Sequence, residues 1–177
     1  MGKKWHFKLQ IFKKTSKQIG PVLWYALAGG EVFIRKDFSE LYSLVSQKAR
    51  PKIITIPTNG WYVDKVYHTV LTMLQNNPYQ SLVIQLSLDG TREIHDKIRG
   101  EGSYERAIKT FNRLKPLRNL YPVLQLAFIT VVTPQNKHIY PDFIDELVSF
   151  DPNQVNVNLF RYGYLDHPPL ESEMIET

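Results

Sequence analysis

Short apolar runs alternate along the chain with segments whose apolar residues recur at helical spacing. Three of these runs end in a polar turn that contains glycine. They span residues 22–28, 53–56 and 82–86. Apolar runs of this kind, closed by such turns, are typical of buried strands. The glycines that close the turns, Gly30, Gly60 and Gly90, repeat every 30 residues, which is the length of a strand, a helix and two short loops.

Apolar spacing also predicts the elements between and beyond these strands. The predicted helices span residues 38–45, 63–74, 104–114 and 143–148, and two further strands span 123–132 and 155–160. Ser103 precedes the third helix and is predicted to be its N-cap. The alternating segment Trp5–Phe12 predicts an extra strand at an edge of the sheet.

Strands that alternate with helices predict an α/β fold with a parallel sheet. Such a chain forms either an open doubly wound sheet or a barrel, and a complete eightfold barrel needs about 250 residues. With 177 residues, the chain suits a partial (β/α)6 TIM-like barrel with its helices outside, incomplete at the N-terminus. Either architecture places ligands at the carboxyl ends of the strands, because that rim gathers the loops that follow them.

The absence of cysteine excludes several kinds of chemistry that depend on a thiol. The sequence contains none, which excludes disulfides, thiolate nucleophiles and cysteine-held iron–sulfur clusters for this polypeptide. No apolar run approaches the roughly 18 residues of a membrane span, and the N-terminus lacks the pattern of a secretory signal. We therefore expect a cytoplasmic protein without a membrane contact.

Charge is unevenly distributed. The net charge is +5, but six lysines precede the first acidic residue, Glu31. We divide the chain into a basic N-terminal arm (1–20), a barrel domain (21–165) and an acidic tail (166–177). The arm is interpreted as a solvated segment; the alternative is a non-catalytic binding module whose arm attracts an acidic partner or RNA. No nucleic-acid-binding signature accompanies the arm, which argues against RNA.

Polar residues at the strand ends are the candidate site. Gly29 and Gly30 expose backbone to a ligand, and Glu31 adds a carboxylate. The next turns supply Thr58 with Asn59, and Ser87 with Asp89. We expect these turns to converge on one site. Each set also has a simpler interpretation, as a tight turn, a helix cap or a solvated acid.

Two further segments are predicted to lie at the same rim. The sequence predicts a charged loop at His95–Gly100, in which Asp96 or Glu93 pairs with Arg99 rather than binding a metal with His95. A fourth polar turn ends at Asn136. Motifs of zinc hydrolases, nucleotide triphosphatases and serine hydrolases are absent from the sequence. A non-radical barrel enzyme in which Glu31 and Asp89 act as general acid and base remains a second hypothesis.

Taken in order, these motifs resemble the radical S-adenosylmethionine superfamily, in particular the branch whose members carry SPASM-type auxiliary-cluster domains. The likeness covers about residues 22–160. It depends on Ala28-Gly29-Gly30-Glu31-Val32-Phe33-Ile34-Arg35-Lys36-Asp37, Ile56-Pro57-Thr58-Asn59-Gly60, Leu86-Ser87-Leu88-Asp89-Gly90 and His95-Asp96-Lys97-Ile98-Arg99-Gly100. Intact relatives generate a 5′-deoxyadenosyl radical for peptide modification or cofactor maturation.

The resemblance implies a partial (β/α)6 barrel and a role for each candidate residue. Gly29, Gly30 and Glu31 match the motif that meets the methionyl ammonium of S-adenosylmethionine. Ser87 would approach the ribose or the carboxylate. The remaining positions that the resemblance implies are Thr58 and Asn59, which would line the pocket, and Asp89, Arg99 and Asn136.

Two departures from the family pattern stand out. Val32 occupies the position of a proline, which we expect to loosen the turn. The loop C-x-x-x-C-x-x-C, which holds the [4Fe–4S] cluster in the family, has no counterpart, since the chain has no cysteine. We therefore expect this polypeptide alone to be inactive in radical chemistry.

The resemblance also predicts that the chain is a fragment or a degenerate member of the family, cut at both ends. A miscalled start, a split gene, a pseudogene or a shortened expression product would each fit. The expected small-molecule partner is S-adenosylmethionine, and the intact relative would act on a peptide or protein. The identity of that substrate is not predicted, because in such barrels specificity comes from segments outside the shared motifs.

Overall fold

The computed structural model describes residues 20–160 of the 177-residue chain. Most of the basic arm, the acidic tail and the predicted edge strand Trp5–Phe12 lie outside the described residues. Within the described part, no helix is both long and apolar enough to span a membrane.

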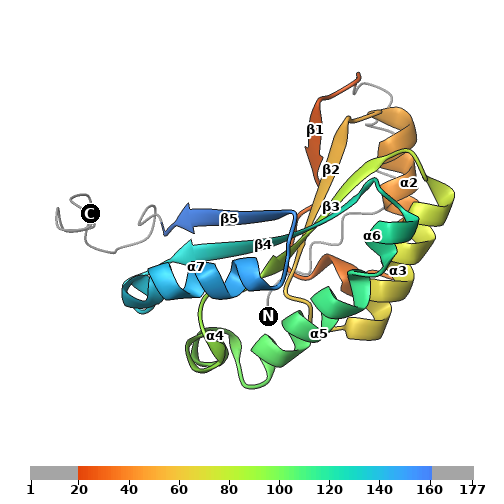
Figure 1. The fold of residues 1–177 in the computed structure, drawn as a ribbon. Coiled ribbons are helices and arrows are strands. Elements are labelled where there is room, and N and C mark those ends of the chain that lie inside the picture. The colour runs from red at the N-terminus through yellow and green to blue at the C-terminus, as the bar shows by residue number, and fades with distance from the viewer. Residues whose placement is uncertain (1–19, 161–177) are drawn as a thin grey trace, which may run out of the picture.

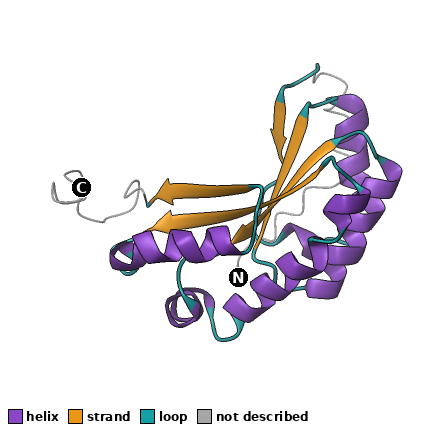
Figure 2. Cartoon of the chain, viewed as in Figure 1, coloured by secondary structure: helices purple, strands orange, loops and turns teal. Residues whose placement is uncertain are grey.

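Five parallel strands form one sheet in the order β1-β2-β3-β4-β5. The sheet curls into an arc, and the helices cover its outer side (Figures 1 and 2). The strands are β1 (Trp24–Ala26), β2 (Ile53–Thr58), β3 (Ser81–Ser87), β4 (Leu124–Val132) and β5 (Gln154–Leu159). This arc confirms the predicted α/β partial barrel.

Six α-helices and two 3-10 helices connect the strands within the described residues. They are η2 (Val32–Ile34), α2 (Phe38–Lys48), α3 (Val63–Asn76), α4 (Arg92–Arg99), α5 (Ser103–Leu114), α6 (Leu117–Leu120), η3 (Lys137–Ile139) and α7 (Tyr140–Ser149). The predicted helices correspond to α2, α3, α5 and α7. The short helix α6 was not predicted, because four residues are too few to show helical spacing.

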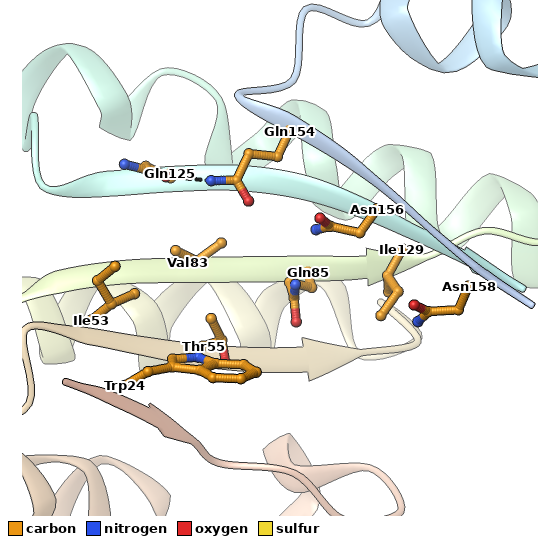
Figure 3. Close-up of a pocket in the computed structure, with 10 residues that line it drawn as sticks. All are labelled: Trp24, Ile53, Thr55, Val83, Gln85, Gln125, Ile129, Gln154, Asn156 and Asn158. Carbon is orange, nitrogen blue, oxygen red and sulfur yellow. Dashed lines mark hydrogen bonds between the residues drawn. The ribbon is translucent and has the colours of Figure 1, made fainter. Parts of the chain in front are cut away.

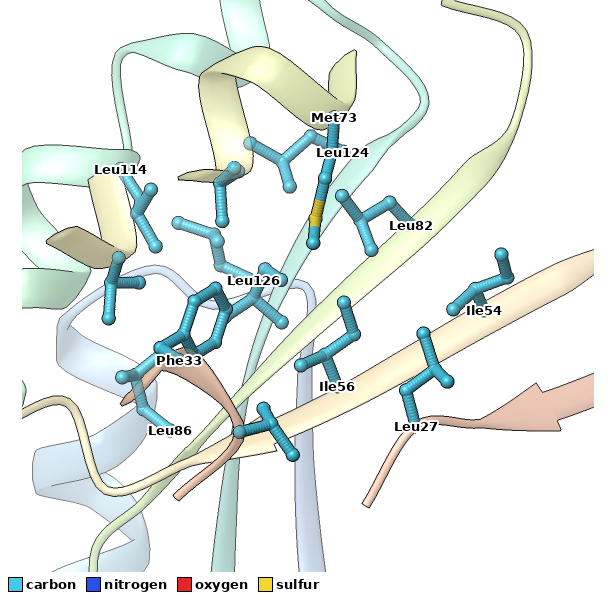
Figure 4. Packing of buried hydrophobic residues seen from close by; sticks show 14 of the residues in the cluster. Leu27, Phe33, Ile54, Ile56, Met73, Leu82, Leu86, Leu114, Leu124 and Leu126 are labelled. Carbon is cyan, nitrogen blue, oxygen red and sulfur yellow. The ribbon is translucent and has the colours of Figure 1, made fainter. Parts of the chain in front are cut away.

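The strands alternate between an outer face against the helices and an inner face on the hollow of the arc. On β2 and β3, Ile54, Ile56, Leu82, Ile84 and Leu86 are almost fully buried. Figure 4 shows several of them packed with residues such as Phe33, Met73 and Leu114. This layer is the core, and its burial is the main stabilising contribution to the fold.

The predicted charged loop at His95–Gly100 is wrong. Residues Arg92–Arg99 form α4, an amphipathic helix whose inward residue, His95, is fully buried. The sequence shows no helical pattern here because the segment is short, highly charged and has few apolar residues to mark a helical face.

Ser103 is not the N-cap of the third predicted helix. It is the first residue of α5, and Gly102 precedes it with φ of 77°. The cap is supplied instead by Asp96 of α4, whose carboxylate accepts bonds from Gly102 N–H, Ser103 Oγ and Tyr104 N–H. These bonds, that from Tyr104 first, lower the pKa of Asp96 below its usual value.

Gly60 lies where the turn after β2 meets α5. Its φ is +70°, and an added Cβ would lie 2.8 Å from Ala107 Cα and 3.1 Å from a Leu86 methyl. The Thr110 hydroxyl donates to the Gly60 carbonyl at 2.7 Å. Glycine is therefore needed here both for the backbone conformation and for the close approach of the helix.

We expect Gly60→Ala to lower the free energy of unfolding by about 2 kcal/mol, because it combines a strained φ with overpacking. Gly102→Ala is the matched control, since Gly102 shares a positive φ (+77°) but has no heavy atom within 4 Å of the added Cβ. The control should lose about 1 kcal/mol in urea unfolding. Equal losses in the two variants would show that the close approach to α5 has no energetic role.

Candidate functional site

The loop after β1 is tied to the end of β2 by the Glu31 carboxylate. Its Oε1 accepts the Phe33 N–H at 3.1 Å and its Oε2 accepts the Asn59 N–H at 2.9 Å. The Thr58 hydroxyl donates to the same carboxylate, at 3.0 Å from each oxygen. The structure thus brings together Glu31, Thr58 and Asn59, as the sequence predicted.

Gly29 and Gly30 leave the backbone of this loop open. Both are exposed, and an added Cβ at Gly30 would meet no heavy atom within 4 Å. The Glu31 carboxylate can accept about four hydrogen bonds. Three donors of the chain use about three of these positions, so about one remains. Open backbone beside a carboxylate with a remaining acceptor position suits a ligand ammonium.

Val32 occupies the first position of the 3-10 helix η2, with Glu31 as the N-cap. Proline is favoured at the first helical position because that N–H has no partner within the helix. The position of Val32 would therefore also accept the proline of the family pattern. With valine at this position, Glu31 still forms its hydrogen bonds.

A second group of candidate residues surrounds Asp89 at the carboxyl end of β3. Its Oδ2 pairs with Arg99 Nε at 2.6 Å, and its Oδ1 accepts the Val131 N–H of β4 at 2.9 Å. The Asn136 amide donates to the Asp89 carbonyl at 2.7 Å. Asp89, Arg99 and Asn136 therefore hold β3, α4 and the loop after β4 together.

The ion pair predicted between Arg99 and either Asp96 or Glu93 is wrong. Arg99 pairs with Asp89, while Asp96 caps α5. The sequence favoured acids three and six residues earlier in the chain, whereas Arg99, at the end of α4, lies against Asp89 just after β3.

Ser87 lies at the end of β3, between the two groups. It pairs with Ile129 of β4, and β2 ends at Thr58, which pairs with the preceding residue, Leu86. The Ser87 hydroxyl is half-buried and makes no hydrogen bond to another residue of the described part of the chain. It is therefore available to a ligand at the rim.

His95 contributes to the second group and was not predicted to do so. Its Nδ1 accepts the Asp89 N–H at 3.0 Å, and its buried Nε2 has no partner among the described residues. Burial lowers its pKa to about 4, against the opposing influence of the nearby Asp89 carboxylate. The imidazole is therefore neutral near pH 7 and serves as an acceptor for backbone.

The geometry gives no support to the hypothesis that Glu31 and Asp89 act as general acid and base. Asp89 is 4% exposed and both its oxygens are engaged, by Arg99 and by Val131 N–H. Glu31 is engaged by three donors in a separate group. Neither carboxylate is thus placed to exchange a proton with a shared substrate.

The hollow of the arc contains a cavity of about 420 Å³ that the sequence analysis missed. Figure 3 shows its lining, which comes from all five strands: Trp24, Ile53, Thr55, Val83, Gln85, Gln125, Ile129, Gln154, Asn156 and Asn158. The available signal was the alternation of amides in β5, at Gln154, Asn156 and Asn158. Across residues 20–160, no three His, Cys, Asp or Glu side chains group to hold a metal ion.

No protein-family profile matches the chain. The antilisterial bacteriocin subtilosin biosynthesis protein AlbA of Bacillus subtilis is 30% identical over 110 residues, which are 60% of this chain and 23% of AlbA. The mycofactocin maturase MftC of Mycobacterium tuberculosis is 34% identical over 94 residues, which are 52% of this chain and 22% of MftC. The match thus spans less than a quarter of the length of these relatives.

Solved structures share the fold. The structure of anSMEcpe with bound AdoMet (S-adenosylmethionine) aligns with a TM-score of 0.64 at 15% identity, covering 86% of this chain and 40% of that chain. Native anSMEcpe with bound AdoMet and Kp18Cys peptide aligns with a TM-score of 0.63 at 15% identity, covering 86% and 42%.

The half-barrel and its rim motifs define the class of protein: a partial TIM-like barrel of the kind found in S-adenosylmethionine-binding structures. The sequence relatives make the assignment more specific. The predicted likeness to the radical S-adenosylmethionine superfamily, and to its SPASM-type branch, is confirmed.

Proposed function

We propose that this chain forms the S-adenosylmethionine-binding wall of a radical S-adenosylmethionine maturation enzyme. The observation that carries the proposal is the open Gly29-Gly30 backbone beside Glu31, with the Ser87 hydroxyl unengaged on the same rim. The AdoMet-bound neighbours of the same fold support it.

The rim fits the ligand in chemical terms. S-adenosylmethionine presents an ammonium, a carboxylate and ribose hydroxyls. Exposed backbone at Gly29 and Gly30, with the Glu31 carboxylate, would accept from the ammonium. The Ser87 hydroxyl would bond the ribose or the carboxylate, and Thr58 and Asn59 would line the pocket. Asp89, Arg99 and Asn136 would keep the rim in position rather than touch the ligand.

The [4Fe–4S] cluster of the family does not fit the residues of this chain. The 177 residues include no cysteine, and such clusters are held by thiolates. These residues therefore supply no ligand set for the cluster, and the proposal is limited to binding. We propose that the chain is a degenerate or partial member, as opposed to a complete catalyst. Its likeness to the AlbA and MftC proteins suggests peptide maturation as the setting.

Calorimetric titration with S-adenosylmethionine tests the proposal. We expect measurable binding to the wild-type chain and at least tenfold weaker binding to Gly30→Leu, whose side chain would occupy the ligand's approach. Gly20→Leu is the matched control: Gly20 is also exposed with no heavy atom within 4 Å of an added Cβ, but it precedes β1 and lies away from the rim.

Ser87→Ala should weaken binding less, by about 1 kcal/mol, the usual loss of one hydrogen bond. Circular dichroism of each variant shows whether it is folded. The absence of binding heat with the folded wild-type chain would overturn the proposal. Equal affinity in wild type and Gly30→Leu would place S-adenosylmethionine elsewhere.

A further inference from the structure

Helix α5 carries a row of cations on its solvent-facing side. Arg106, Lys109 and Arg113 are all exposed, and their spacing of three and four residues places them on one face of the helix. With a rise of about 1.5 Å per residue, this basic row extends over about 10 Å. Figure 1 shows α5 beside α3 on the outer side of the arc, opposite the hollow that contains the cavity.

Aromatic rings hold the two arginines of the basic row in place. The guanidinium of Arg106 lies 4.5 Å from the centroid of the Trp61 ring, and that of Arg113 lies 4.7 Å from the centroid of the Tyr67 ring. Arg106 also donates to the Trp61 carbonyl at 3.4 Å. A guanidinium stacked on a ring keeps N–H donors along its edge. Because the arginines are already ordered, less conformational entropy is lost when a partner binds them.

Two cations of the basic row have no acidic partner. Neither Arg106 nor Lys109 forms an ion pair within residues 20–160. Arg113 pairs with Asp64, whereas Glu105, the acid of α5, pairs with Arg92 at 3.7 Å. The row therefore keeps positive charge that the described part of the chain does not neutralise, and this charge attracts an acidic partner.

The aromatic residues beside the basic row favour a protein partner. Tyr62 follows Trp61 and is 43% exposed. Trp, Tyr and Arg are the residue types most enriched among those that contribute most to protein–protein binding. A surface of lysines alone would suit any polyanion, whereas this surface combines cations with exposed aromatic area. It thus offers apolar contact as well as charge.

The spacing of the cations favours a helix with acids on one face. In an antiparallel helix, carboxylates at i, i+4 and i+7 would lie opposite Arg113, Lys109 and Arg106 in turn, because both helices have the same rise per residue. The exposed carboxylates of Asp64 and Glu105 border the row. They would repel a nucleic acid, whose backbone carries a charge at every nucleotide. A helix with acids on one face only avoids this repulsion.

We propose that the basic row of α5 docks an acidic amphipathic helix of a protein partner, whose carboxylates pair with Arg106 and Lys109. Arg113, already paired with Asp64, lies at the end of the contact. The inference goes beyond the proposed function and does not rest on it. The surface lies on the helix side of the sheet and shares no residue with the rim or with the cavity.

Fluorescence anisotropy of a labelled acidic peptide with the whole chain tests the inference. The probe is a blocked, alanine-rich peptide with glutamates at the i, i+4 and i+7 spacing. The comparison peptide has the same composition, with its glutamates spread around the helix. We expect the probe to bind at least tenfold more tightly than the comparison peptide, and to weaken at least tenfold between about 50 and about 300 mM salt. Equal affinity for the two peptides, or an affinity that salt does not change, would overturn the inference.

Lys109→Glu should weaken the acidic peptide at least tenfold, because it replaces an attraction by a repulsion in the middle of the row. Lys109 has no polar contact to another described residue, so the variant should fold. Lys48→Glu is the matched control, since Lys48 is an exposed lysine at the end of α2 and its replacement changes the net charge equally. Arg106→Gln is a second variant and should also weaken the peptide. Unchanged affinity in Lys109→Glu, or an equal loss in Lys48→Glu, contradicts the assignment.

Two further measurements separate this inference from its alternatives. Oligouridine RNA should bind more weakly than the acidic peptide at the same salt concentration. Tighter binding of the RNA that is lost in Lys109→Glu would overturn the choice of a protein partner. Gly30→Leu should lose S-adenosylmethionine but bind the acidic peptide as the wild-type chain does, and Lys109→Glu should do the reverse. Failure of the proposed function and failure of this inference are therefore distinguishable.

Discussion

Asp89→Ala is expected to lower the free energy of unfolding by about 3 kcal/mol, because it removes a buried carboxylate that accepts hydrogen bonds from Arg99 and from the Val131 N–H. The Asp89 carboxylate is almost completely buried. It connects the end of β3 to α4 through Arg99, and to β4 through the Val131 N–H. Its removal leaves the Val131 donor without an acceptor and Arg99 without its counter-ion. Urea unfolding followed by circular dichroism measures the loss.

The control for Asp89 is an aspartate of the same chemistry at the surface. Asp64 pairs with Arg113, and its side chain is 77% exposed. Exposed ion pairs contribute about 0–1 kcal/mol, so Asp64→Ala should lose far less than Asp89→Ala. Asp89→Asn should retain part of the stability, since its amide oxygen still accepts from Val131. Similar losses for Asp64→Ala and Asp89→Ala would contradict the role assigned to burial.

Acidification from pH 7 to pH 4 is expected to cost about 3 kcal/mol of stability through His95. Its pKa is about 4 in the folded chain, below the ordinary 6.5. The unfolded chain therefore takes up a proton first as the pH falls. This contribution is fully present above pH 6.5 and is lost progressively down to pH 4, at about 1.4 kcal/mol for each unit of difference in pKa.

The charged groups near His95 act in different pH ranges. Asp89 and Asp96 favour the imidazolium, Arg99 opposes it, and burial outweighs them all. The lowered pKa of Asp96 stabilises the fold above the ordinary pKa of an aspartate, so that its contribution is lost only in more acidic solution. The range between pH 4 and 6.5 therefore reports mainly on His95.

Unfolding free energies at pH 7, 5.5 and 4.5 measure the effect. His95→Leu should flatten the dependence in this range, at the cost of the bond to the Asp89 N–H. His68→Leu is the control, because His68 lies exposed on α3 against Tyr67 and should leave the slope unchanged. A slope that survives in His95→Leu would assign the titration to another group.

Most of the fold could be predicted from the sequence because the central strands β2, β3 and β4 are buried on the helix side along most of their length. Ile54, Ile56, Leu82 and Leu86 form runs that no exposed strand would show, and the glycines at 30-residue spacing mark the same rim three times. The α4 helix was missed because it buries mainly one residue, His95, and carries charges elsewhere. A helix held by side-chain hydrogen bonds shows little periodic spacing of apolar residues in its sequence.

The candidate site was predicted in part. Residue types at strand ends indicated which side chains would meet, and Glu31 does contact Thr58 and Asn59. The sequence did not show that Arg99 and the Val131 N–H would engage both carboxylate oxygens of Asp89, because these partners come from other elements. The inner face was missed since its amides, such as Gln85 and Asn156, lie on separate strands and meet only when the sheet curls.

The arc has two ends. Among the described strands, β1 and β5 each have a neighbour on one side only, so their outward N–H and C=O groups are not used by the sheet. A closed barrel presents only side chains to a molecule in its interior. An arc with a free margin also presents main chain, so an extended segment lying beside β5 would gain backbone hydrogen bonds that depend little on its sequence.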